Sequence, residues 1–271
     1  MSGVDLTLDH VGIAVPDLEA GRRTYAALGF HLTDRSMHSG ALEPGGPVVP
    51  WGSGNHCAML RCGYIEVLGL VDATLHSTVK HLLKRYEGAH IVALRTPDAD
   101  ASFAAYQQAG VPARAPAALQ RQLDEGQVLG FRNIYFEGPD YAQARFITIE
   151  HQTPDLLWRP DLLDHPNTAV ALRSVTLVAA PADVEAIRAR LGRAFPLAPA
   201  DALRVAGADT WTAPLPGAVP CVAGFEVAVR DLDACAALLT ANGVPHVRAA
   251  SGALVVPPAA AAGAQLTFVQ D

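Results

Sequence analysis

One unit recurs four times along the chain, and it limits what this sequence can fold into more than any other feature. Each copy begins with an apolar strand, continues through a turn into an amphipathic helix, and ends the helix near a glycine. In the first copy the strand is expected at 10–15 and the helix at 18–28, with Asp17 as N-cap and Gly29 as C-cap. Extended segments follow each helix, so each copy is predicted as β, α and then two or three β.

The other three copies repeat this order. The second has a strand at 90–95, a helix at 99–109 and strands near 127–136 and 144–151. The third has a strand at 172–179 and a helix at 182–191, and the fourth has a strand at 224–229, a helix at 232–242 and a last strand at 266–269. The stretch 257–264 is predicted as a turn between two short strands. The sequence therefore predicts an α+β fold of four βαβββ modules, with the last two partly degenerate.

The length of the chain fits two domains. Its 271 residues, 50% of them hydrophobic, are enough for two cores of about 100 to 150 residues each. Prolines interrupt regular structure between the second and third copies. We therefore expect a first domain at 1–155, a connector at 156–169 and a second domain at 170–271, with Trp158 of the connector packed against the body of the protein.

Charge and cysteine content exclude several classes of function. A net charge of -7 with scattered basic residues gives no footprint for nucleic acid. No apolar run approaches the roughly 20 residues of a membrane helix, and the opening residues lack a signal peptide pattern, so a cytoplasmic protein with no membrane partner is expected. The cysteines form no CxxC pair and are expected to be buried thiols; they are Cys57, Cys62, Cys221 and Cys235. The oligomeric state is left open, with a homodimer as one outcome.

Two polar residues in apolar strands carry most of the functional signal. His10 lies in the first strand and Glu66 in the segment GYIEVLG. On strands that lie side by side, such a pair indicates a metal site. The alternative is structural, with His10 bonded to a backbone carbonyl and Glu66 paired with an arginine.

The opening LDHVGIAVPDLEAGRRTYAALGF resembles the first module of the vicinal oxygen chelate superfamily, which includes glyoxalase I, methylmalonyl-CoA epimerase, extradiol dioxygenases and antibiotic-resistance proteins. The strings SMHSG, WGSGNHCAML and GYIEVLG resemble the glyoxalase-like branch more narrowly. The resemblance covers residues 8 to 170 well and the remainder only through the repeat. It implies that the modules pair into two glyoxalase-like half-barrel domains, although one fold hosts many chemistries.

The resemblance also implies a ligand set for a divalent metal, drawn from the first and last strand of each of the first two modules. Carried over by position, the ligands are His10, Glu66, His90 and Glu150, with internal intervals of 56 and 60 residues. Such ligands suit Zn, Ni, Mn, Co or Fe(II).

Two positions in the second module have competing neighbours. The Pro-Asp turn begins six residues after His10 but seven after His90, so that Ile91 faces the cup unless a bulge or longer turn restores His90. His151 competes in the same way with Glu150, and the resemblance of FITIEH to the family's closing strand favours Glu150.

Further polar residues are candidates for the substrate pocket: His38, Asn55, His56, Arg132 and Asn133. Strand parity allows at most one of Asn55 and His56 to point inward, and a loop brace explains each equally well. Arg132 has a structural ion pair as its alternative. The C-terminal half has Ser174 and Gly224 at the place of His10, so no metal is expected there, and His165 is interpreted as a turn residue more than as a lid.

These features predict a metal-dependent glyoxalase-like enzyme, an isomerase, epimerase or lyase, acting on a small substrate with adjacent oxygen atoms. The metal would stabilise an enolate, and Glu66 or Glu150 would leave it to move a proton. The first alternative is an Fe(II) extradiol-type dioxygenase with two histidines and one glutamate as ligands. The second is a non-catalytic small-molecule-binding or resistance protein that has lost the ligands, which the shift at His90 favours.

Overall fold

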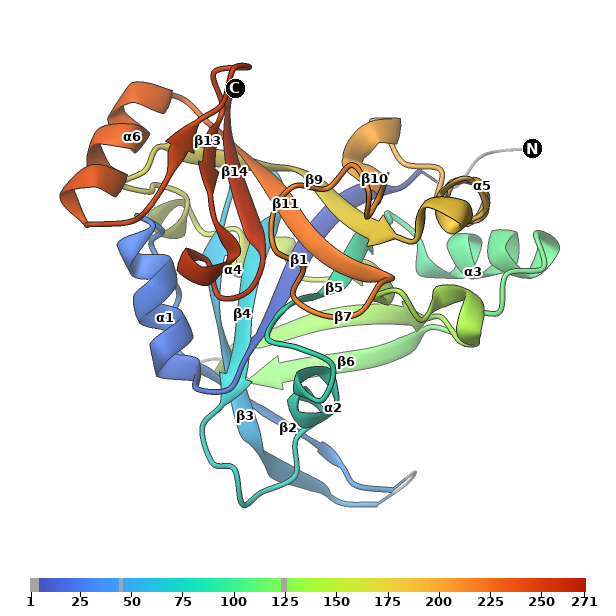
Figure 1. The fold of residues 1–271 in the computed structure, drawn as a ribbon. Coiled ribbons are helices and arrows are strands. Elements are labelled where there is room, and N and C mark those ends of the chain that lie inside the picture. The colour runs from blue at the N-terminus through green and yellow to red at the C-terminus, as the bar shows by residue number, and fades with distance from the viewer. Residues whose placement is uncertain (1–4, 44–45, 123–125) are drawn as a thin grey trace.

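The computed structural model describes residues 5–43, 46–122 and 126–271, and it contains two β-sheets (Figure 1). The first sheet has the strand order β2-β3-β4-β1-β5-β8-β7-β6, and the second has the order β10-β9-β11-β14-β13-β12. The predicted α+β class is confirmed. None of the helices in the described ranges is long and apolar enough to cross a membrane.

Each predicted module forms its elements close to the expected bounds. The first comprises β1 (Thr7–Val15), α1 (Leu18–Ala27), β2 (Ser36–Ala41), β3 (Val48–Met59) and β4 (Tyr64–Leu70). The second, which follows the short helix α2 (Val79–Leu83), comprises β5 (Gly88–Arg95), α3 (Ala99–Gln108), β6 (Ala117–Gln122), β7 (Val128–Tyr135) and β8 (Arg145–His151). The two modules meet where β1 pairs antiparallel with β5, so the sheet is built from two similar halves.

The C-terminal half repeats the order in shortened form. The third module has β9 (Ala169–Ala179), α5 (Val184–Ala194) and β10 (Leu203–Gly207). The fourth has β11 (Cys221–Val229), α6 (Leu232–Ala241), β12 (Val247–Arg248), β13 (Leu254–Val256) and β14 (Gln265–Gln270). A 3-10 turn at Pro258–Ala260 joins β13 to β14, as the sequence predicts for this stretch.

The expected helix caps are present. The side chain of Asp17 accepts a hydrogen bond from the backbone of Ala20 at 3.0 Å, and Asp98 and Asp231 cap α3 and α6 in the same way. Gly29 has a φ of +86°, a conformation in which a Cβ would be strained, and so it ends α1.

The two faces of the first sheet have different surroundings. One face packs under the helices and against the second sheet in a continuous core that includes Val11 and Ile13 of β1 and Val175 of β9. The other face, called the inner face here, carries a separate apolar cluster of Ala14, Leu68, Val79, Ile91, Ala93, Ile147 and Ile149. Because the main core is continuous between the sheets, the division into domains at 155 and 170 stays a prediction.

The connector packs against the body of the protein, as expected. Its helix α4 (Pro154–Leu157) is followed by Trp158, whose indole N–H donates to the carbonyl of Leu60 at 3.0 Å and whose ring packs near Tyr64. Of the four cysteines, Cys62 is exposed and the other three are buried, so the expectation of buried thiols is wrong for Cys62.

Truncation of Trp158 should loosen this contact. We expect Trp158→Ala to lower the free energy of unfolding by about 2 kcal/mol, less than for a fully buried tryptophan because the ring is half-buried. Trp158→Phe keeps an aromatic ring and loses the hydrogen bond to Leu60, so its loss should be about 1 kcal/mol. Urea denaturation measures both, and equal losses would show that the ring contributes nothing beyond its hydrogen bond.

Candidate functional site

His10 and Glu66 lie together on the inner face, as predicted. β1 pairs in parallel with β4, and His10 lies opposite Tyr64, two residues before Glu66. The two side chains approach to 4.0 Å between Nε2 of His10 and Oε2 of Glu66. The ring of His10 stacks on that of Tyr64 with 4.3 Å between centroids, which limits its rotation.

A β-bulge brings Asp9 to the same side of the strand as His10. In the pairing of β1 with β5, Leu8 lies opposite Leu94 and His10 opposite Ala93, so Asp9 is an extra residue in the ladder. Its buried carboxylate contacts Nδ1 of His10 at 2.7 Å and Nε2 of His151 at 2.8 Å. Asp9 therefore fixes the orientation of both imidazoles.

Asp9 and Glu66 are both held in the ionised form. Burial alone would raise the pKa of Asp9, but its hydrogen bonds with His10 and His151 lower that pKa well below the usual range. Burial also opposes ionisation of Glu66, and the charges of His10, His38 and Arg121, with a hydrogen bond from Asn55, outweigh it and lower the pKa of Glu66. The inner face thus carries a carboxylate beside an oriented histidine.

The equivalent positions of the second module are occupied by isoleucines. Ile91 precedes the N-cap Asp98 by seven residues, as His10 precedes Asp17. Ile91 lies opposite Arg145 on β8, and two residues further is Ile147, so the interval from Ile91 to Ile147 is the same 56 residues that separate His10 from Glu66.

Side-chain packing agrees with this register. Both isoleucines belong to the inner apolar cluster. A Cβ on Gly12 of β1 would lie only 2.7 Å from the Cβ of Ile91, so the glycine makes room for that side chain.

The expected placement of His90 has to be corrected. The ladder skips His90, because Gly12 lies opposite Ile91 and Ile13 opposite Ala89. The sequence left open a bulge that would return His90 to the cup, but with the bulge present the imidazole lies against Tyr86. The rings stack at 3.9 Å between centroids, and Nε2 donates to the carbonyl of Tyr86 at 2.9 Å.

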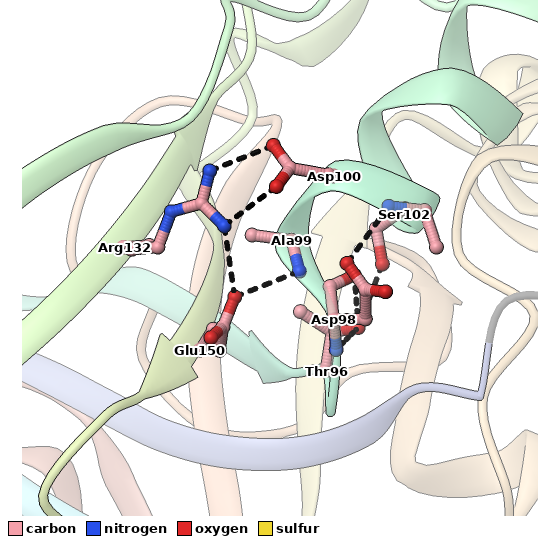
Figure 2. Close-up of polar contacts among 8 residues, drawn as sticks. Thr96, Asp98, Ala99, Asp100, Ser102, Arg132 and Glu150 are labelled. Atoms are coloured by element: carbon pink, nitrogen blue, oxygen red, sulfur yellow. Dashed lines mark hydrogen bonds and ion pairs between the residues drawn. The ribbon is translucent and has the colours of Figure 1, made fainter.

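Glu150 also lies outside the inner face and serves helix α3 instead. Figure 2 shows its carboxylate accepting a hydrogen bond from the backbone N–H of Ala99 at 2.9 Å, at the start of the helix. Arg132 forms a bidentate pair with Asp100 and lies 3.5 Å from Glu150, so the structural alternative for Arg132 holds. Since residues alternate along β8, His151 takes the inward position, where it contacts Asp9.

The remaining pocket candidates divide between the two faces of the sheet. Asn55 bonds Glu66, and His38 contacts Ser53 at 3.0 Å, so both lie on the inner face. His56 points the other way and contacts the carbonyl of Thr33 at 2.8 Å, as parity requires of a neighbour of Asn55.

Asn133 and His165 complete the predicted set. Asn133 lies on β7 between Phe131 and Tyr135 of the inner face, and its side-chain oxygen is buried without a hydrogen-bond partner among the described residues. His165 contacts the carbonyl of Met59 at 2.7 Å and accepts from the backbone of His31 at 3.0 Å, so it braces the connector.

Two arginines on the inner face are absent from the predicted set. Arg145 lies over the ring of Tyr135, 5.6 Å from its centroid. Arg121 lies on β6, five strands from Glu66 in sheet order, or about 24 Å on a flat sheet. Its charge nevertheless contributes to the lowered pKa of Glu66, so the sheet curls until β6 approaches β4. Both arginines stand alone in the sequence, and nothing in the sequence predicts that Arg121 approaches Glu66.

The predicted metal set does not fit this arrangement. His10 and Glu66 are present, but Ile91 and Ile147 hold the two matching positions, and His151 is engaged by Asp9. Within the described ranges no three His, Cys, Asp or Glu side chains gather as ligands do around a metal ion. A four-ligand site and a site of two histidines and one carboxylate both lack their donors here.

Comparison with known proteins identifies the fold. Residues 8–195 match the family profile described as "Glyoxalase-like domain". A hypothetical protein from Staphylococcus aureus is similar in structure, with a TM-score of 0.62 and 13% identity over 98% of this chain and 100% of that one. A mutant of 4-hydroxymandelate synthase from Streptomyces coelicolor gives a TM-score of 0.64 and 11% identity over 99% and 93%. Identities this low show the fold alone, and no curated protein sequence matches the chain.

The position of His90 predicts a pH dependence of stability. Burial lowers the pKa of His90 to about 4, and nearby Arg85 acts in the same direction. The unfolded histidine titrates near 6.5, so the unfolded state takes up a proton first as the pH falls. Protonation of His90 in the unfolded state should therefore lower the free energy of unfolding by roughly 3 kcal/mol as the pH falls from 6.5 to 4.

Urea midpoints across that range measure the effect. His90→Phe, which preserves a ring against Tyr86, should flatten the pH dependence, whereas His76→Phe on an exposed loop should leave it unchanged. An unaltered slope in His90→Phe would assign the dependence to other groups.

Proposed function

Because the chain belongs to the glyoxalase-like domain family of the vicinal oxygen chelate superfamily, we propose that it is an isomerase, epimerase or lyase that moves a proton next to a carbonyl group of a small substrate with adjacent oxygens. The observation that carries this proposal is the pair of His10 and Glu66, 4.0 Å apart on the inner face and oriented by Asp9. Proton abstraction needs a carboxylate or imidazole held within reach of the reacting carbon.

Glu66 serves as the base. Its lowered pKa keeps it ionised near neutral pH, and the hydrogen bond from Asn55 fixes its Oε1. Its Oε2 is the atom nearest to Nε2 of His10. A substrate carbon placed beside Oε2 therefore gives up its proton to a carboxylate whose neighbour can take part in the same transfer.

His10 serves as the second proton carrier. The ionised Asp9 accepts a hydrogen bond from Nδ1 of His10, so Nε2 is the ring nitrogen that faces Glu66. An imidazole oriented by a buried carboxylate can accept a proton at Nε2 and return it to another atom of the substrate. Epimerisation, isomerisation and elimination differ in which atom receives that proton, so the same pair serves all three.

The metal-stabilised enolate is not part of this proposal. Only two of the four expected donors occupy ligand positions, so no step is assigned to a metal ion. Other groups of the inner face carry positive charge toward a developing anion, namely Arg121 and Arg145. The dioxygenase alternative needs a third protein ligand and loses its support for the same reason.

A binding protein without catalysis is the second candidate. Ile91 and Ile147 at the ligand positions favour it, because an apolar wall suits the capture of a small molecule. The two candidates differ in whether Glu66 is needed for a chemical step or only for shape.

Proton exchange separates the two candidates. We expect the protein to accelerate the exchange of the C3 protons of 2-oxobutyrate with deuterium in D₂O, followed by NMR. Glu66→Gln and His10→Ala should each lower the rate by about 100-fold or more, as for loss of a general base. Glu150→Gln, which changes the helix cap of α3, should exchange near the parent rate. Exchange that is unaffected by Glu66→Gln would remove this carboxylate from the proposal.

Metal content tests the register argument directly. The parent protein should retain less than about a tenth of an equivalent of Mn, Fe, Ni or Zn after loading and dialysis, since two donors bind weakly. The double variant Ile91→His with Ile147→Glu restores four donors and should retain close to one equivalent. Ile91→His with Ile149→Glu is the matched control, because Ile149 lies two residues beyond the ligand position. Equal retention by both double variants would refute the register assigned to Ile147.

A further inference from the structure

Within the described ranges, Arg145 presents a positive charge on the inner face without a carboxylate to neutralise it. It begins β8 and alternates with Ile147 and Ile149, which both belong to the inner apolar cluster. Its guanidinium lies over Tyr135. No carboxylate of the described chain lies within ion-pair distance of it, although most arginines in those ranges, such as Arg132 and Arg204, have such a partner.

Arg121 faces the same space from the opposite edge of the sheet. On β6, Ala117 lies opposite Asn133 and Leu119 opposite Phe131, both of the inner face, so alternation directs Arg121 inward as well. It too has no ion-pair partner among the described residues. Its charge lowers the pKa values of Glu66 and His38, which places it opposite the first module.

His38 connects the two arginines to the catalytic pair. Burial lowers its pKa, and the charges of Arg121 and Arg145 act in the same direction while Glu66 opposes them. Groups from β2, β4, β6 and β8 therefore face one space. The second module supplies the positive charges that face this space, and the first module supplies the carboxylate of Glu66.

From this arrangement we infer that the substrate is a carboxylic acid whose carboxylate is held by Arg121 and Arg145. The inference rests on the proposed function and names its substrate class. A guanidinium matches a carboxylate in shape and charge through two parallel hydrogen bonds. Repulsion from Glu66 keeps the carboxylate on the arginine side, so the carbon that bears the transferable proton, C2 of a 2-hydroxy acid or C3 of a 2-oxo acid, faces Glu66 and His10.

The adjacent oxygen also has a potential partner. The buried side-chain oxygen of Asn133 lacks a hydrogen bond within the described chain and lies on the strand between Arg121 and Arg145. A buried acceptor without a partner is costly, so a hydroxyl donor of the ligand would satisfy it. A 2-hydroxy acid, or the enol form of a 2-oxo acid, supplies such a donor beside its carboxylate.

The experiment compares an acid with its neutral amide. Isothermal titration with 2-hydroxybutyrate and 2-hydroxybutyramide should show at least about tenfold tighter binding of the acid, the size expected of a charge-assisted hydrogen bond. Arg121→Gln and Arg145→Gln should each weaken binding of the acid by about tenfold or more and leave the amide unchanged. Arg114→Gln, an exposed arginine paired with Glu137, is the control for loss of one positive charge. Circular dichroism confirms that each variant is folded.

The outcomes separate this inference from the proposed function. Glu66→Gln should lower proton exchange by about 100-fold or more and still bind the acid, because it removes the base and keeps both arginines. Discrimination between acid and amide without any exchange would support the inference and oppose catalysis. Equal affinity for acid and amide, or no binding of either 2-hydroxybutyrate or 2-oxobutyrate at about 10 mM, would overturn the inference whatever the exchange shows.

Discussion

The antiparallel pairing of β1 with β5 is the constraint on which the site depends. It joins the two modules of the first sheet, and each module alone places its first and last strands side by side. One bulge of this pairing turns Asp9 toward His10 and His151. The other lies at His90, which alternation from the inward Ile91 already directs away from the inner face, and whose ring stacks on Tyr86. A ladder without bulges would place Asp9 on the opposite face from His10 and break the carboxylate contact that orients both histidines.

The sequence was a good guide wherever local chemistry decides the structure. The strand, turn and helix of each copy are local signals, with a Pro-Asp pair in the first two copies, and α1, α3 and α6 begin at the residues expected from their caps. His10 and Glu66 were likewise predictable, because a charged residue in an apolar strand needs a reason to be there. Asn55 and His56 divide between the two faces as parity requires.

The errors arose where the register of one strand against another decides the structure. Residue type favoured His90 and Glu150, since both are good ligands close to the right interval. Counting back from the N-cap Asp98 gives Ile91 instead, and the 56-residue interval of the first module then leads to Ile147. The roles of Asp9 and Arg121 could not be predicted from the sequence for a different reason. The role of Asp9 depends on a bulge and that of Arg121 on the curl of the sheet, and neither feature leaves a local sequence pattern.

The two modules have diverged into unlike halves of one inner face. A symmetric metal cup needs donors from both, but here the first module supplies the carboxylate and the histidine, and the second supplies isoleucines and arginines. This division has a chemical consequence. Positive guanidinium groups stabilise an anion without requiring ligand geometry, and an apolar wall excludes water and strengthens each charge interaction. In the proposed function, fixed cations at the edge of the inner face take the electrostatic role that a central ion has in a metal cup, and Glu66 and His10 handle the proton.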